Sequence, residues 1–408
     1  MTNKPLAGIN VLDMSWFGAG PIAGRALANA GARVIKLETE KRIDGLRAMA
    51  PRPKGARGYN LSGYFNNYNS DKESVTIDLT TEKGYELGLK LIQWSDVMLT
   101  NMTNRATNQI KVDWETIKKV NPKIVAAYMP MMGATGPYKD FQGFGAMLTA
   151  ICGMNYLSGF DKNRPVGVGT NYPDYVVNPM HAYIAILSAL RIAKKTNKGQ
   201  KVELSQNESS IAAMSLPLFT YDNAKIKHQR LGNRVAFAAP HGVYRCKDDE
   251  NGDEKWITIA CIDESHWQTL TKIIDNEELN KQEFNNFESR KKAEDQIDKI
   301  ISAWTSGLDH LQAQATLQDA KIPAGVVQNA QEVVEDSHLS QRGYFVSLDH
   351  VEAGTRIYDG TGWKMSQTPI GMEKAAPLLG EHTFDVCTTI LELPPEEIAE
   401  LVAEQVLF

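Results

Sequence analysis

The sequence of 408 residues predicts an α/β protein with two domains, and three observations support this. In the first third, short apolar runs alternate with segments of helical spacing. This is the pattern of βαβ units, and it predicts a parallel sheet with helices on its faces. After about residue 225 the pattern changes to a polar hairpin followed by charged, mostly helical segments. The chain is also long for a single domain, which favours two.

Strands and helices alternate through the expected first domain. The predicted strands are INVLDMS, ARVIKLE, DVMLTN, KIVAAYMPM and GQKVELS. The predicted helices are PIAGRALANAG, which Gly31 closes, then TEKGYELGLKLIQWS, WETIKKVNP, an apolar helix over 179–194, and NESSIAAMSLPLF. Asn178 and Pro179 suit the cap and first-turn positions of the helix over 179–194.

The second half predicts a smaller α+β domain and a return to the first. CKDDENGDEKWITIACI predicts a hairpin with a polar turn, 263–320 is mostly helical, and KIPAGVVQNAQEVVED predicts a strand, a turn and a helix. LPPEEIAELVAEQVLF predicts an amphipathic helix begun by Pro394 and Pro395 that packs on the first domain. We therefore expect a large domain over 1–215 that is completed by about 370–408, a small domain over 225–335, and a linker over 336–369.

Composition narrows the class of function. A formal net charge of −5 argues against nucleic acid or an anionic membrane as the main partner. The longest apolar stretches, such as 182–190, are short for a bilayer span, and MTNKPLAGINVLDMS has no sustained apolar run of the kind a secretory signal has. We expect a cytoplasmic protein.

The cysteines and histidines give no sign of a metal or redox site. The cysteines lie far apart and none forms a C-x-x-C pair, so we expect all of them to be buried apolar residues: Cys152, Cys246, Cys261 and Cys387. The histidines are dispersed and form no H-x-x-x-H or H-E-x-x-H motif. No metal site is expected.

A glycine-rich turn follows the first predicted strand. LDMSWFGAGPIAGRA places Gly18, Gly20 and Ala23 at the spacing G-x-G-x-x-A, and Glu38 closes the second strand. This satisfies a loose dinucleotide fingerprint, but glycines in a tight strand-to-helix turn, or a site for the nucleotide part of another ligand, explain it equally. The aromatic pair at 16–17 crowds the turn, and no hydride-site His or Tyr-x-x-x-Lys stands out, so NAD is less favoured.

The stretch GTNYPDYVVNP holds one carboxylate, Asp174, between two prolines and ahead of an apolar helix. From the residues alone, Asp174 is either an ordinary helix-start residue or a reactive group aimed at a substrate.

Separated blocks in order along the chain resemble the class III CoA-transferases, the family of formyl-CoA:oxalate and carnitine CoA-transferases. The blocks are PLAGINVLDMSWFGAGPIAGRALANAGARVIKLE, NSDKESVTIDL, SDVMLTN, MGATGPYKDFQGF, TNKGQKVELSQNESS and APLLGEHT. The variants NYPD and APHGVY are most similar to subunits of succinyl-CoA:benzylsuccinate CoA-transferases. The resemblance runs over nearly the whole chain.

This resemblance implies a Rossmann-like large domain that contains both termini, a small domain, and an interlocked dimer with sites at the interface. It implies Asp174 as the nucleophile, which relays an acyl group through a mixed anhydride and an aspartyl-CoA thioester. It also implies CoA contacts from Phe17, Gly18, Lys72, Asn101 and Met102. The expected substrates are an acyl-CoA, such as succinyl-CoA, and a carboxylic acid, with no tightly bound cofactor.

The chain departs from the family pattern in several places. NMTNRATNQIKV replaces the usual N.rPG continuation, Gln109 stands where a basic residue is frequent, and GFGAM lacks an aspartate that is common there. FAAPHGVY over 237–244 stands in the region of the mobile glycine loop, and we expect its His241 to be structural.

Two other functions stay open. An acyl-CoA racemase needs a second base, and the first histidine of the chain, His181, comes only after Asp174. Some similar enzymes consist of two related chains, so a subunit of a heterodimeric transferase is the stronger alternative to a homodimer.

Overall fold

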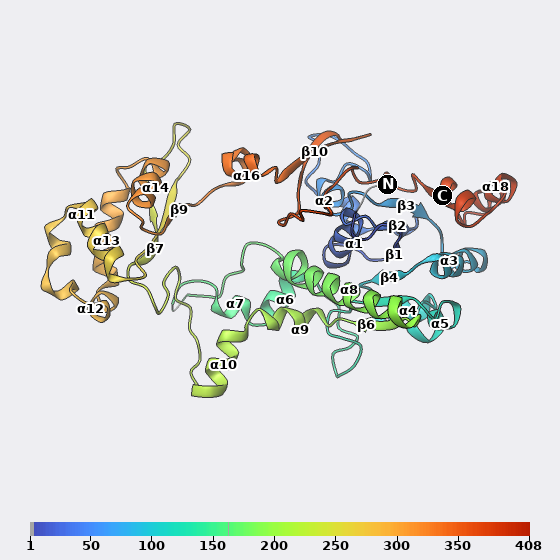
Figure 1. Ribbon diagram of the computed structural model, residues 1–408, viewed down its shortest axis with the longest axis horizontal. Coiled ribbons are helices and arrows are strands. Elements are labelled where there is room, and N and C mark those ends of the chain that lie inside the picture. Colours follow the sequence, from blue (N-terminus) through green and yellow to red (C-terminus); the bar gives the residue numbers. More distant parts are fainter. Residues whose placement is uncertain (1–3, 162) are drawn as a thin grey trace. The chain divides into compact units, whose positions relative to one another are not determined.

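The computed structural model describes residues 4–161 and 163–408, which form two compact units (Figure 1). The first unit runs to Met154 and includes Gly167–Lys227 and His338–Phe408, while the second consists of Asn155–Val166 and His228–Ser337. The division differs from the expected domains in two respects. The segment 155–166 belongs to the second unit, and the expected linker over 336–369 contains helix α16 (Ser337–Arg342) and a hairpin of β10 (Phe345–His350) and β11 (Gly354–Asp359).

A six-stranded parallel sheet forms the centre of the first unit, with strand order β3-β2-β1-β4-β5-β6. The strands are β1 (Asn10–Asp13), β2 (Arg33–Glu38), β3 (Glu73–Thr76), β4 (Val97–Thr100), β5 (Val125–Tyr128) and β6 (Gln200–Glu203). The predicted parallel sheet and the strands β1, β2, β4, β5 and β6 are confirmed. Strand β3, which lies at one edge, was not expected.

Helices cover both faces of this sheet. The helices of the first unit are α1 (Ala19–Asn29), α2 (Gly63–Tyr68), α3 (Glu82–Trp94), α4 (Asn104–Gln109), α5 (Trp114–Val120), α6 (Gly145–Ile151), α8 (Asn178–Thr196), α9 (Gln206–Ala212), α10 (Ser215–Ala224), α17 (Thr383–Thr389) and α18 (Pro395–Ala403). Helix α10 buries none of its residues. Neighbouring strand residues point to opposite faces. Val11 and Val97 belong to the core under α1 and α8, whereas Leu12 and Met98 belong to the core under α3, α5 and the C-terminal helices.

The long apolar helix starts earlier than expected. A π-helical turn, Pro173–Val177, precedes α8 without a break, and Asn178 donates its backbone N–H to the carbonyl of Pro173. Asn178 is therefore a fully buried residue inside the helix rather than its cap. By length and composition alone the segment Pro173–Thr196 could cross a membrane. Because Ala182, Ile186 and Leu190 pack in the core beside the sheet, we describe it as a core helix.

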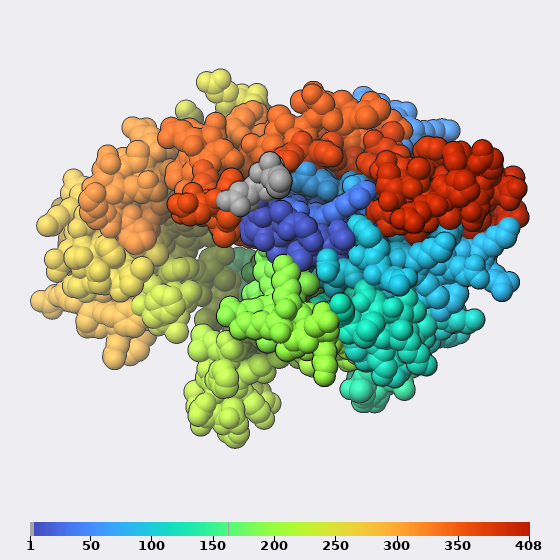
Figure 2. All heavy atoms as spheres, turned by 45° about the vertical axis from the view of Figure 1, so that its right-hand side comes forward, coloured from blue at the N-terminus to red at the C-terminus, as the bar shows by residue number. Residues whose placement is uncertain are grey.

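The C-terminal segment belongs to the first unit and packs against the β3 edge of its sheet. Leu407 forms a β-bridge with Ile77, and the N–H of Asp78 donates to the carbonyl of Val406 at 2.9 Å. Figure 2 shows this segment, in red, against the light-blue residues of the β3–α3 region. The C-terminal residues therefore support strand residues that line the site described below.

The second unit is built on a three-stranded antiparallel sheet in the order β7-β8-β9, with β7 (His241–Arg245), β8 (Trp256–Ala260) and β9 (Ala324–Val326). Around it lie α11 (Glu264–Ile274), α12 (Phe287–Lys292), α13 (Glu294–Thr305), α14 (His310–Asp319) and α15 (Ala330–Glu335). Helix α7 (Met154–Leu157) lies where the chain first passes between the units. The predicted hairpin and the helical stretch are confirmed, and all four cysteines are buried, as expected.

Candidate active site

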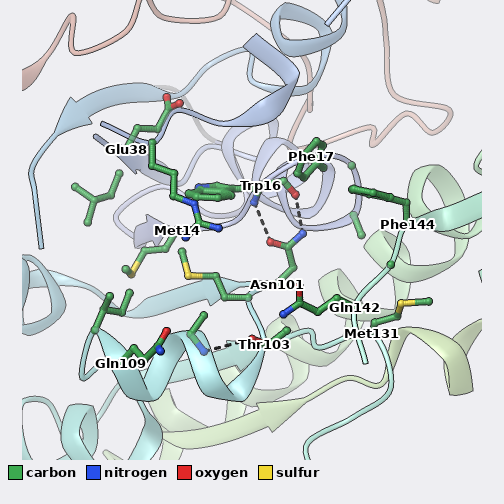
Figure 3. A pocket seen from close by; sticks show the side chains of 18 of the residues that line it. Met14, Trp16, Phe17, Glu38, Asn101, Thr103, Gln109, Met131, Gln142 and Phe144 are labelled. Carbon is green, nitrogen blue, oxygen red and sulfur yellow. Dashed lines mark hydrogen bonds between the residues drawn. The ribbon is translucent and has the colours of Figure 1, made fainter. Parts of the chain in front are cut away.

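A pocket of about 680 Å³ lies at the carboxyl ends of the strands in the first unit (Figure 3). Its walls come from the segments that follow β1, β2, β3, β4 and β5, together with α6, the segment before it and the π-helical turn. In open parallel sheets the carboxyl edge, where the strand order reverses, is the usual place for ligands. Here that reversal lies between β1 and β4. The sheet topology therefore supports this pocket as the functional site.

Asp174 forms part of the pocket wall from the first turn of the long helix. Its Oδ2 accepts a hydrogen bond of 2.9 Å from the backbone N–H of Gly145. Burial raises the pKa of the Asp174 carboxyl to about 6, and the hydrogen bonds from Gly145 and from the Asn178 side chain oppose that rise. The result is a desolvated carboxylate that is still ionised near neutral pH.

Two glycines, Gly145 and Gly18, leave room for this carboxylate. A Cβ on Gly145 would lie 2.6 Å from Asp174 Oδ2, and a Cβ on Gly18 would lie 3.1 Å from Asp174 Cβ. In this structure a side chain at 145, where the family commonly has an aspartate, would meet the Asp174 carboxyl. Gly18, in the first turn, thus lies against Asp174.

Phe17 lies beside Asp174 in a left-handed backbone conformation with φ of 61°. Its N–H donates to Asp44 Oδ1 at 3.0 Å, and its ring packs edge-on against Phe144 with 5.3 Å between the ring centroids. The structure thus brings three of the expected residues, Phe17, Gly18 and Asp174, to one end of the pocket.

Asn101 and Met102, which follow β4, also line the pocket. Asn101 clamps the loop after β1 with two hydrogen bonds: Trp16 N–H donates to its Oδ1 at 2.9 Å, and its Nδ2 donates to the Trp16 carbonyl at 2.6 Å (Figure 3). The Asn101 side chain therefore holds the wall of the pocket in place, and Met102 supplies apolar surface.

Lys72 does not reach the pocket, contrary to the expectation that it binds a phosphate. Its side chain is fully buried, and Nζ contacts Asp13 Oδ2 at 2.7 Å, the Pro21 carbonyl at 2.8 Å and Asn69 Oδ1 at 2.9 Å. Burial lowers the pKa of Lys72 to about 8 in spite of the attraction of Asp13. The ammonium group ties β1 and α1 to the start of β3.

Further buried charges fix the loops after β1 and β2. Lys36 pairs with Asp44 at 3.0 Å and donates to the Ser15 carbonyl at 2.7 Å, and Arg47 pairs with Glu38 at 2.7 Å. Because Arg47 binds both carboxylate oxygens of Glu38, this acid is not free for the ribose hydroxyls of a dinucleotide. The acidic residue that an NAD site would need for the ribose is therefore engaged elsewhere, which disfavours NAD as the ligand of the glycine turn.

Two cations at the pocket, Lys41 and Arg42, were missed by the sequence analysis. The Arg42 guanidinium lies 4.6 Å from the centre of the Trp16 ring, and Lys41 pairs with Asp78 at 2.6 Å. Among the residues that the structure describes, no carboxylate pairs with Arg42. The sequence did hold a signal for these two cations, the charged run TEKR directly after β2. In doubly wound sheets the loops at the carboxyl ends of the strands bind ligands.

A cluster of tyrosines adjoins Asp174 from the other side. The hydroxyls of Tyr64 and Tyr175 are in contact, Asn171 Nδ2 donates to Tyr175 Oη at 3.2 Å, and the Tyr68 ring packs against both tyrosines. Burial raises the pKa of Tyr64, and the negative charge of Asp174 adds to the rise. The Tyr64 hydroxyl therefore remains protonated at neutral pH. No sequence motif pointed to this cluster.

Gln109 and Gln142 add neutral polar groups to the wall, and His241 lies in the second unit with Nδ1 2.6 Å from the carbonyl of Asn233. Within residues 4–161 and 163–408 no group of three or more His, Cys, Asp or Glu residues is arranged to hold a metal ion.

A family model described as CoA-transferase family III matches residues 6–383. The chain belongs to this family. It is 28% identical to the succinyl-CoA–L-malate CoA-transferase alpha subunit of Chloroflexus aurantiacus, over 99% of this chain and 92% of that protein. It is 29% identical to the formyl-CoA:oxalate CoA-transferase of Streptomyces avermitilis, over 99% of this chain and 100% of that protein.

The fold agrees with this assignment. A solved CAIB/BAIF family protein from Brucella suis superposes with a TM-score of 0.86 at 24% identity, over 95% of this chain and 100% of that one. The chain is thus a class III CoA-transferase with the α/β fold of that family.

Proposed function

We propose that the protein transfers CoA from an acyl-CoA to a carboxylic acid, with Asp174 as the acyl relay. The observation that carries this proposal is the desolvated carboxylate of Asp174, held by the Gly145 N–H at one end of a pocket of about 680 Å³. A carboxylate in such a place is a nucleophile that can exchange acyl groups without losing the energy of the thioester.

The reaction has four steps, and no proton or electron is consumed. The Asp174 carboxylate attacks the donor thioester carbon, the C–S bond breaks, and CoA leaves as a thiolate. The thiolate attacks Asp174 Cγ in the resulting mixed anhydride, which forms the aspartyl thioester and releases the donor acid. The acceptor carboxylate then attacks Cγ and displaces the thiolate. Finally the thiolate attacks the acceptor acyl carbon, which gives the new acyl-CoA and frees Asp174.

We place the nucleotide end of CoA at the cationic end of the pocket. Arg42 stacks on Trp16 there, and its guanidinium suits a phosphate group. Phe17, Met102, Met131 and Met147 give the pocket the apolar surface that the pantetheine chain needs on its way to Asp174. Because a similar protein is named for succinyl-CoA and malate, we propose succinyl-CoA as donor and a small dicarboxylic acid as acceptor.

We also propose a dimer, of the interlocked kind that the resemblance implies, with the Rossmann-like domain as its larger part. Helices α8 and α10 expose large apolar side chains: Ile184 is 63% exposed, Leu216 70% and Phe219 64%. Such surface is typical of chains that associate through obligate interfaces.

The direct test is to trap the acyl-enzyme. Purified protein is mixed with succinyl-CoA and then with hydroxylamine, and the tryptic peptide that contains residue 174 is weighed by mass spectrometry. We expect hydroxylamine to leave a hydroxamate on Asp174 and to abolish transfer by the wild-type protein. The variants Asp174→Asn and Asp174→Ala should fold, but they should neither transfer CoA nor acquire the hydroxamate. Transfer at the wild-type rate in either variant would contradict the proposal.

A second candidate is one subunit of a heterodimeric transferase, because the malate enzyme named above is an alpha subunit. In that case the purified chain would form the acyl-enzyme but transfer CoA slowly until a related partner chain is added. A racemase is less favoured, since the residues that line the pocket include no histidine to act as a second base.

A further inference from the structure

Asn178 is a fully buried asparagine four residues after Asp174 on the same helical segment. Its side-chain amide lowers the pKa of the Asp174 carboxyl, against the effect of burial. Residues four apart on a helix lie on the same side, so the π-helical turn leaves Asp174 and Asn178 as neighbours. A buried amide carries two donors and an acceptor, and its orientation decides which of these meets the carboxylate.

A chain of hydrogen bonds that begins at a backbone carbonyl settles this orientation. The carbonyl of Met129, at the end of β5, accepts from Gln206 Nε2 at 2.7 Å. Because that carbonyl is an acceptor only, the Gln206 amide must place its nitrogen there, which turns Oε1 toward Asn178. Gln206 Oε1 then accepts from Asn178 Nδ2 at 3.2 Å. One N–H of the Asn178 amide is left to stabilise the ionised Asp174 carboxyl, in agreement with the lowering effect of this amide on the Asp174 pKa.

The other end of the Asn178 amide is satisfied as well. Asn178 Oδ1 accepts from the hydroxyl of Ser209 and, at 3.5 Å, from that of Ser210. All three side chains of this relay (Asn178, Gln206 and Ser209) are at least nine-tenths buried. The amide cannot flip without leaving several buried groups unpaired, which costs about 1–3 kcal/mol for each group.

We infer that Asn178, oriented by Gln206 and Ser209, acts with the Gly145 N–H as the oxyanion hole for the carbonyl of Asp174 itself. The inference rests on the proposed function, because it assigns the donors for steps two and three of that reaction. In both steps the nucleophile attacks Asp174 Cγ, and negative charge develops on the oxygen that Asp174 keeps. In steps one and four the charge develops on a substrate oxygen, so these donors do not contact it.

The same contacts also affect the ground state. Hydrogen-bond donors to the carboxylate stabilise its ionised form and so lower its pKa. The titratable group that faces Asp174 from α2 is Tyr64, and a negative charge on Tyr64 would raise the Asp174 pKa instead. Loss of the Asn178 donor should therefore raise the pKa of Asp174 above its present value of about 6.

The test separates the first step from the second. Asn178→Leu enzyme is mixed with succinyl-CoA well above the pKa of Asp174, and the free thiol and the aspartyl thioester are followed by rapid quench. We expect thiol release within about threefold of wild type, but aspartyl thioester formation slowed about 10²-fold, the typical loss for one oxyanion donor. The mixed anhydride should accumulate, and water should divert a larger share of each turnover to hydrolysis. The acid limb of the pH profile of kcat/KM should move to higher pH.

Gln206→Met and Ser209→Ala keep Asn178 but release its amide, so they carry the test if Asn178→Leu does not fold. We expect aspartyl thioester formation to slow and the acid limb to move to higher pH in these variants too, but by less than in Asn178→Leu. Asn207→Leu alters an asparagine of α9 outside the relay and should behave as wild type.

Two different results separate the role of Asn178 from that of Asp174. One is that the folded variants at Asn178, Gln206 and Ser209 divide the mixed anhydride between thioester and hydrolysis as wild type does, with a wild-type pH profile. If hydroxylamine still labels Asp174 in them, that result would overturn the role of Asn178 alone. Normal transfer by Asp174→Ala would overturn the proposed function and this inference with it.

Discussion

Gly145 shows at the scale of one residue how closely the site is packed. An added Cβ would lie 2.6 Å from Asp174 Oδ2, and it would meet the very oxygen that the Gly145 N–H holds. We expect Gly145→Ala to fold but to lose about 10²-fold in kcat, because the carboxylate must rotate away from its position. Steady-state kinetics with circular dichroism of the folded variant test this.

Gly167→Ala is a suitable control, since a Cβ at Gly167 would meet no atom within 4 Å. This variant should keep wild-type kinetics. A Gly145→Ala enzyme as active as the control would mean that the carboxylate position does not matter.

The raised pKa of Asp174 leads to a prediction on pH. Only the ionised carboxylate attacks, and burial raises its pKa to about 6, so the reactive fraction falls as pH drops through that value. We expect kcat/KM to be flat near neutral pH and to decrease about tenfold for each pH unit below about 6. Initial rates across the range in which circular dichroism shows a folded protein provide the measurement. A profile without a break down to about pH 5 would be inconsistent with a desolvated nucleophile.

At the scale of elements, the structure gives Lys72 and Arg42 different roles. Lys72 joins β1, α1 and β3 from a buried position, whereas Arg42 stands at the pocket without a carboxylate among the described residues. We expect Lys72→Met to lower the free energy of unfolding by about 3–5 kcal/mol, because it leaves Asp13 unpaired, with little change in the KM for acyl-CoA. Arg42→Ala should do the reverse and raise this KM about tenfold, as the loss of one phosphate contact would.

Urea unfolding and steady-state kinetics on both variants separate these effects. A raised KM with unchanged stability in Lys72→Met would restore the role that the sequence suggested. An unchanged KM in Arg42→Ala would remove the cationic end of the pocket from the CoA site.

The sequence predicted those elements whose pattern reports burial directly. Apolar runs such as KIVAAYMPM mark strands that are covered on both faces, and they were assigned correctly. Strand β3 was missed because Glu73, Ser74 and Thr76 give its residues a polar pattern, while its burial comes from the distant C-terminal segment. The early start of the long helix was missed because Asn178 and Pro179 look like a cap, and only tertiary hydrogen bonds show that Asn178 serves the interior.

The site residues also fall into those that the sequence identified and those that it did not. Motif similarity led to Asp174, Phe17, Gly18, Asn101 and Met102, all of which line one pocket. It led to Lys72 wrongly, because a lysine at the start of a strand does not reveal whether it faces solvent or Asp13. The Asn178 relay and the tyrosine cluster each combine residues from segments that are far apart in the chain, and one sequence does not show which segments meet.

At the scale of the whole molecule, the exposed apolar side chains of α8 and α10 lead to the last prediction. Leu216 and Phe219 are 70% and 64% exposed, an arrangement that a monomer in water does not favour but that a dimer interface would explain. We expect wild-type protein to sediment with twice the 45.3 kDa mass of one chain. The double variant Leu216→Asp/Phe219→Asp should sediment as a monomer, or precipitate, because buried charges destabilise such an interface.

Thr389→Asp, which adds one charge on α17, is the control and should stay dimeric. A double variant that remains a fully active dimer would show that this surface is not the interface, and a wild-type chain that dimerises only with a related partner would favour the heterodimeric transferase.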